Sequence, residues 1–261
     1  MASWQTPHAS GVRLAVLVHA YFPDVLEEIM ARLANIIEPF DLYVTTPHEE
    51  LAAPIFRMGS THAASVTVAV TENRGRDIGP FVNLFRERAF DNYLAVLKLH
   101  TKKSRYSAQG DIWRRSLVNE LIGDSLKVRR IVALFETGQI GLVGPYADYL
   151  SHPSFWGSNR ERTGSLLTAL GARMEVAPSL GFFAGSMFWF APVALKPLQE
   201  ARGESLAFEP EAGQQDGTLA HALERIFAPL ARAQGLRTTS LQLQGMEIAD
   251  TDTSGNRVPV L

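Results

Sequence analysis

The 261-residue sequence contains no cysteine, and this absence restricts its chemistry. Disulfide bonds and thiolate–zinc sites are excluded, which fits a reducing cytoplasm. The HExxH, GxSxG and P-loop motifs are also absent, which excludes the commonest metalloprotease, hydrolase and phosphate-loop sites. The one Asp-x-Asp is Asp250-Thr251-Asp252, in a polar tail. We therefore expect no divalent metal and no other cofactor.

The sequence also lacks a charge excess and a long apolar run. Its 25 basic and 27 acidic residues give a formal net charge of −2, so we expect no binding to nucleic acid and only a local anion site. The N-terminus does not resemble a signal peptide. The longest apolar run, 180–195, contains Ser186 and Pro192 and is too short to span a bilayer. We expect a cytoplasmic protein whose only membrane contact is peripheral, at the inner face of the cell membrane.

Strand-like and helix-like segments alternate over the first hundred residues, which is typical of an α/β fold with a mostly parallel sheet flanked by helices. We expect residues 1–11 to be flexible, 12–246 to form a single domain and 247–261 to be a polar tail. Strands are predicted at 12–20, 42–45, 65–70, 94–99, 140–143 and 182–190. Helices are predicted at 24–37, 78–88, 113–122, 126–137 and 219–227.

The motif Asn73-Arg74-Gly75-Arg76-Asp77-Ile78-Gly79-Pro80-Phe81 follows a predicted strand and opens a helix. Two arginines, with glycines that allow close approach of the backbone, suit a diphosphate group. Ligands of open α/β sheets bind beyond the carboxyl ends of the strands. The alternative is an ordinary turn with solvated arginines and Asp77 as a helix N-cap.

A cationic motif, Lys98-Leu99-His100-Thr101-Lys102-Lys103, ends the fourth predicted strand. Alternation along a strand places Lys98 and His100 on the same face. Because an unpaired ammonium is costly inside an apolar strand, Lys98 indicates an anionic partner. The alternative is a solvated surface patch.

Two further segments can contribute to a site. The loop 208–218 carries three carboxylates before a helix, and Asp216, or else Glu211, is our candidate for a general base that deprotonates a hydroxyl. Asp216 can equally be a helix N-cap. In the segment 181–189, Gly185, Ser186 and Trp189 are candidates for lining a sugar pocket, with burial in the core as the alternative.

The order of these motifs, from VHAYF at 18–22 through NRGRDIGPF and LKLHTKKS to FEPEAGQQDGTLAHALER, resembles the rhamnan synthesis F family over about residues 12–230. The resemblance implies a GT-A-like, Rossmann-like fold, with a donor half at 12–103 and an acceptor half at 104–246. Metal-dependent GT-A enzymes carry an Asp-x-Asp where this chain has Lys98-Leu99-His100. This departure suggests that lysine and histidine neutralise the leaving diphosphate without a metal.

The activity that the resemblance implies is inverting, metal-independent glycosyl transfer in surface polysaccharide or lipopolysaccharide assembly. The donor would be a nucleotide-diphosphate sugar of the dTDP- or GDP-rhamnose type, and the acceptor a glycan, including a lipid-linked one. The alternative is a non-catalytic nucleotide- or sugar-binding module of an assembly complex. The expected donor-binding residues are His19, Arg74, Arg76, Asp77, Lys98, His100 and Lys102.

Overall fold

A computed structural model describes residues 3–8, 10–101, 103, 110–151, 153–172, 181–201, 206–241, 248–250 and 258–259. Its strands are β1 (Ser3–Gln5), β2 (Leu14–His19), β3 (Phe40–Thr46), β4 (Ser65–Val70), β5 (Ala95–His100), β6 (Ile140–Val143), β7 (Tyr149–Leu150), β8 (Phe182–Phe183), β9 (Phe188–Phe190), β10 (Arg237–Leu241), β11 (Ile248–Asp250) and β12 (Val258–Pro259). Within these ranges, one mixed sheet has the order β1-β4-β3-β2-β5-β9-β6-β10-β11-β12, and β7 pairs with β8 separately.

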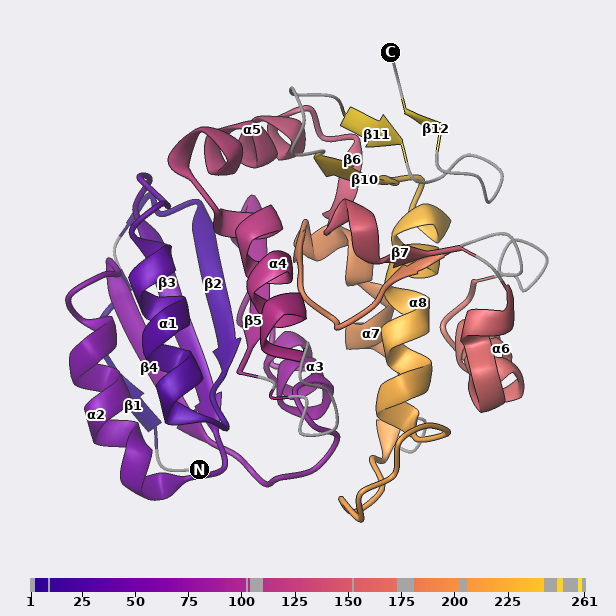
Figure 1. Cartoon of the computed structure of the whole chain (residues 1–261), viewed down its shortest axis with the longest axis horizontal. Coiled ribbons are helices and arrows are strands. Elements are labelled where there is room, and N and C mark those ends of the chain that lie inside the picture. The colour runs from indigo at the N-terminus through magenta and orange to yellow at the C-terminus, as the bar shows by residue number, and fades with distance from the viewer. Residues whose placement is uncertain are drawn as a thin grey trace.

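The helices cover both faces of the large sheet (Figure 1). They are α1 (Pro23–Leu33), α2 (Glu49–Gly59), α3 (Ile78–Arg86), α4 (Gly110–Ile122), α5 (Ser125–Glu136), α6 (Arg160–Ala169), α7 (Pro197–Glu200) and α8 (Leu219–Ala233). Alternate side chains of β2 enter two different cores. Leu14, Val16 and Val18 pack with α1, α2, α4 and α5, whereas Ala15 and Leu17 pack on the face covered by α3, α6, α7 and α8. The predicted Rossmann-like α/β sheet flanked by helices is confirmed.

The strand order changes direction beside β2. From β2 the chain builds outward through β3 to β4, all parallel, and then returns to pair β5 in parallel with the other side of β2. His19 and His100, the last residues of β2 and β5, lie opposite each other in the register. Such a reversal leaves a crevice beyond the carboxyl ends of the two strands, where open α/β sheets bind their ligands.

The segment predicted as a strand at 182–190 is instead two short strands separated by a turn. β9 pairs antiparallel with both β5 and β6, so the turn before it lies at the carboxyl end of β5. In this turn Gly185 has φ 89° and Ser186 has φ 54°, which an extended strand cannot accommodate. Trp189 is fully buried, and its Nε1–H donates to the Leu121 carbonyl at 3.2 Å. Trp189 therefore lies in the core and does not line a pocket, contrary to the prediction.

Some elements differ from those expected. Ser3–Gln5, in the segment predicted to be flexible, pairs antiparallel with β4, because that edge strand offers unpaired backbone groups. The helices α2 and α6 and the strand β10 were not predicted. Pro54 inside α2 argues against a helix when only the sequence is read. The helix α8 also continues past Pro229 to Ala233, beyond the predicted end at residue 227.

Candidate functional site

A pocket of about 650 Å³ lies at the carboxyl ends of β2 and β5, where the strand order reverses. Residues from both predicted halves line it, since α4, the β8–β9 turn and α8 contribute as well as β2 and β5. Its aromatic lining residues are Tyr21, Phe22, Trp113, Phe155 and Phe182. Aromatic faces beside convergent polar groups are typical of small-ligand sites and suit the stacking of a base or a sugar.

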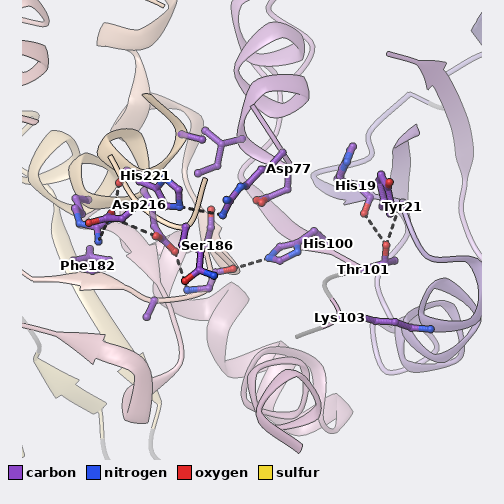
Figure 2. Close-up of a pocket in the computed structure, with 18 of the residues that line it drawn as sticks. His19, Tyr21, Asp77, His100, Thr101, Lys103, Phe182, Ser186, Asp216 and His221 are labelled. Carbon is purple, nitrogen blue, oxygen red and sulfur yellow. Dashed lines mark hydrogen bonds and ion pairs between the residues drawn. The ribbon is translucent and has the colours of Figure 1, made fainter. Parts of the chain in front are cut away.

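Figure 2 shows how the labelled lining residues are arranged. His19, Tyr21, Thr101 and Lys103 lie on one side, and Phe182, Ser186, Asp216 and His221 on the other, with Asp77 and His100 between them. The Thr101 hydroxyl accepts hydrogen bonds from the backbone N–H groups of Tyr21 and Phe22, at 2.8 and 2.9 Å. These bonds fix the loop between β2 and α1 against the end of β5.

Lys98 lies beneath the pocket and is not one of its lining residues. Its side chain is 1% exposed, and its ammonium donates to the Asp77 carboxylate at 2.5 Å and to the carbonyl and hydroxyl oxygens of Ser186 at 2.8 and 2.9 Å. These three acceptors match the three protons of an ammonium group. The anionic partner expected for Lys98 is thus Asp77, and no proton remains for a bound diphosphate.

Asp77 occupies the N-cap position of α3, but its side chain makes no cap hydrogen bond. Although burial by itself raises the pKa of the Asp77 carboxyl, the charges of His100 and Lys98 and the hydrogen bond from Lys98 bring that pKa well below its usual range. Asp77 is therefore an ionised carboxylate at the floor of the pocket. The predicted alternative of a simple N-cap does not describe it.

His19 and His100 complete the floor of the pocket. The Nδ1 atom of His19 lies 2.9 Å from the Thr45 hydroxyl, and burial lowers the pKa of His19 to about 4. His100 Nε2 is 2.7 Å from the Gly185 carbonyl oxygen, and because a carbonyl can only accept, this nitrogen carries the proton.

The Gly185–Ser186 turn is held by side chains from two elements. Lys98 and His100 of β5 bind its carbonyl oxygens, and Glu224 of α8 accepts from the Gly185 N–H at 2.9 Å. A Cβ atom on Gly185 would lie 2.9 Å from Leu117, so both the positive φ and the close packing favour glycine here. The prediction that Gly185 and Ser186 line a pocket agrees with their position.

The arginine motif is bound to the loop that follows Leu206. A Cβ atom on Gly75 would lie 2.4 Å from the Phe208 ring, and the Arg76 N–H donates to Glu211 at 3.1 Å. The Arg76 guanidinium donates to the Gln214 carbonyl and to His221 Nε2. Arg76 lines the pocket with a strained φ of 55°. Arg74 is half-exposed and is not among the lining residues.

Both candidate bases, Asp216 and Glu211, line the pocket, and hydrogen bonds hold Asp216 in place. Asp216 accepts from the Ser158 N–H at 3.1 Å, the Ser158 hydroxyl at 2.8 Å and the Asn159 amide. Burial alone would raise the pKa of Asp216, but these hydrogen bonds lower it well below the usual range. The N-cap of α8 is Thr218, in a capping box with His221, so the alternative role of Asp216 as N-cap is wrong.

Several lining residues were not among our site predictions. His221, Glu224 and Arg225 project from one face of α8, at the spacing of three and four residues that places helix side chains together. The Arg225 guanidinium lies 4.9 Å from the centre of the Phe182 ring and donates to the Phe155 carbonyl. The polar triplet in an otherwise apolar helix was the signal available in the sequence. Thr101, Lys103 and Trp113 also line the pocket, whereas Lys102 lies outside the described residues.

The comparisons with known proteins agree with the order of the motifs. The family model described as rhamnan synthesis protein F matches residues 2–236. The chain belongs to the rhamnan synthesis protein F family. Two curated relatives, each named uncharacterized protein WxcX, come from strains B100 and ATCC 33913 of Xanthomonas campestris pv. campestris and are 35% identical over 228 residues. That match covers 87% of this chain but only 32% of each relative, so the chain spans about a third of their length.

Among the described residues, no group of three or more His, Cys, Asp or Glu side chains is arranged to hold a metal ion. Across the same part of the chain, no helix is long and apolar enough to cross a membrane.

The depressed pKa of His19 predicts how stability depends on pH. Between pH 6.5 and about 4 the unfolded chain binds a proton at His19 that the folded chain does not, so the free energy of unfolding falls as the pH is lowered through this window. The expected contribution is about 3 kcal/mol, since each pKa unit corresponds to about 1.4 kcal/mol. His19→Gln should flatten this dependence in urea denaturation at pH 7 and pH 4.5, whereas replacement of the exposed His62 by Gln should not. If the free energy of unfolding fell equally between pH 7 and pH 4.5 in all three proteins, the lowered pKa of His19 would be contradicted.

Proposed function

We propose that this chain is an inverting glycosyltransferase domain that transfers a sugar, rhamnose, from a nucleotide diphosphate to a growing surface polysaccharide. The pocket at the strand reversal carries the proposal, because its place, volume and aromatic lining suit a nucleotide sugar, in a chain whose family is named for rhamnan synthesis. The donor would be of the dTDP- or GDP-rhamnose type, and the acceptor a glycan, free or lipid-linked. Such an acceptor would bring the domain to the inner face of the cell membrane.

The reaction would be a single displacement at the anomeric carbon. An acceptor hydroxyl oxygen attacks that carbon, the bond to the diphosphate oxygen breaks, and a carboxylate takes the hydroxyl proton. Arg76 lines the pocket on the side of α8 and is the cationic side chain that we assign to the leaving diphosphate. Charge stabilisation of this kind lowers the barrier where negative charge develops.

A divalent metal, which related GT-A enzymes use, does not fit the residues at this position. The carboxyl end of β5 presents His100 and Thr101 in place of carboxylates, and Asp77 is ion-paired with Lys98. Hard divalent cations prefer oxygen ligands with negative charge. We therefore assign no step of the reaction to a metal ion.

The proton acceptor is assigned to Asp216, with Glu211 as the second choice. Asp216 is ionised at neutral pH and lines the pocket on the side of α8. Its low pKa makes it a weak base, and three donors already bind its oxygens. That saturation favours the second candidate function, a non-catalytic nucleotide- or sugar-binding module, which would bind the same ligand without turnover.

The affinity for nucleoside diphosphates tests whether this pocket binds the donor. Arg76→Gln should weaken binding of the nucleoside diphosphate about 10-fold or more, the effect of losing a charge-assisted hydrogen bond. Arg74→Gln is the matched control, because Arg74 precedes it by two residues and lies outside the pocket lining, and its effect should be smaller. Isothermal titration with dTDP and GDP measures both. Equal losses in the two variants, or none in either, would argue against this site.

The rate of sugar transfer distinguishes the proposed glycosyltransferase from the non-catalytic binding module. Asp216→Asn should reduce transfer about 100-fold or more, the usual contribution of a general base, with nucleotide affinity within a few-fold of the wild type. Glu211→Gln is the parallel variant, and the larger loss identifies the base. Circular dichroism controls for folding, since Asp216 also binds Ser158 and Asn159. Nucleotide binding without transfer to any glycan acceptor would favour the module.

Chelation tests the metal independence. Transfer from labelled dTDP-rhamnose or GDP-rhamnose should continue at an undiminished rate in excess EDTA, because the residues at the end of β5 provide no carboxylate pair for a divalent cation. Loss of activity on chelation, and its recovery on addition of Mg²⁺ or Mn²⁺, would refute this.

A further inference from the structure

Asp77 presents one free carboxylate oxygen to the pocket. Its Oδ2 atom binds the Lys98 ammonium, while no hydrogen-bond donor among the described residues reaches Oδ1. The side chain is 13% exposed and lines the pocket together with His19 and His100. A ligand that fills the pocket displaces water from this oxygen, so a ligand that supplies a hydrogen-bond donor in its place is favoured there.

The negative charge of Asp77 disfavours the diphosphate part of a nucleotide sugar at this position. A carboxylate repels the oxygens of a diphosphate, whereas sugar hydroxyl groups donate to it strongly. Lys98 cannot reverse this preference, because its three protons are bound by Asp77 and Ser186. Among the cationic side chains that line the pocket, Lys103 and Arg225 come from other segments. Arg76 directly precedes Asp77, but its guanidinium donates to the Gln214 carbonyl and to His221 on the side of α8.

We infer that Asp77 is the acceptor for hydroxyl groups of the transferred sugar, and that Lys98 is a positioning residue that fixes the Asp77 carboxylate and the Ser186 turn beside it. This inference rests on the proposed function and assigns one part of the donor to one part of the pocket. The floor formed by Asp77, His19 and His100 takes the hydroxyl-bearing sugar, and the diphosphate lies toward Arg76 on the side of α8. Asp77 thereby discriminates a nucleotide sugar from the nucleotide alone.

The test compares two affinities in each protein. With dTDP and dTDP-rhamnose, and with GDP and GDP-rhamnose, isothermal titration gives the ratio by which the sugar improves binding. Asp77→Asn should reduce this ratio about 10-fold and change the affinity for the nucleoside diphosphate itself less than 3-fold. Asp91→Asn is the matched control, since Asp91 pairs with Arg88 outside the pocket. A variant that loses affinity equally for both ligands overturns the inference.

Two further experiments cover the cases in which Asp77→Asn does not fold or the protein binds no nucleotide. Asp77→Asn leaves the buried Lys98 ammonium unpaired, which destabilises folded proteins. If that variant does not fold, the double variant Asp77→Asn with Lys98→Met removes both charges, and the same fall in ratio is expected.

Binding of free rhamnose, followed by saturation-transfer NMR, tests the sugar position without a nucleotide. Binding of rhamnose that depends on Asp77, in a protein that binds no nucleotide, would uphold the sugar site and refute the proposed function. Absence of both would refute both.

Discussion

The ion pair between Lys98 and Asp77 is the interaction on which the floor of the pocket depends. An ammonium group that is 1% exposed would be strongly unfavourable alone, and its three acceptors compensate for the lost hydration. Because those acceptors come from α3 and from the β8–β9 turn, the single lysine joins three segments that are distant in sequence. The rings of Phe81 and Phe188, 5.5 and 5.8 Å from the ammonium, close the site around it.

Around this centre, loops from both parts of the chain hold one another in place. The Arg76 backbone and side chain bind the loop that carries Glu211 and Gln214, and Asp216 of the same loop binds Ser158 and Asn159. Two of the non-glycine residues with positive φ, Arg76 and Ser186, lie at this pocket. Backbone strain of this kind persists where surrounding contacts determine the conformation, and it commonly accompanies function.

The sequence predicted the regular part of the fold well, because apolar strands that alternate with amphipathic helices depend on local patterning. It failed where tertiary contacts override local preference. The helix α2 forms despite Pro54, and α8 continues through Pro229, since packing of an apolar face stabilises both. The strand predicted across Gly185 is broken because side chains of β5 and α8 bind the turn there.

The sequence by itself determined the Rossmann-like fold class, the family and the motifs that supply most of the pocket, including His19, Arg76 and Asp216. Only the tertiary structure decided what each charged residue does. A lysine in an apolar strand shows that an anion must be near, but the sequence does not identify that anion, because Asp77 lies 21 residues away along the chain. Likewise, Trp189 lies in the core and Arg74 lies outside the pocket lining. The burial of a side chain depends on the neighbours that the fold brings to it and not on the residue type alone.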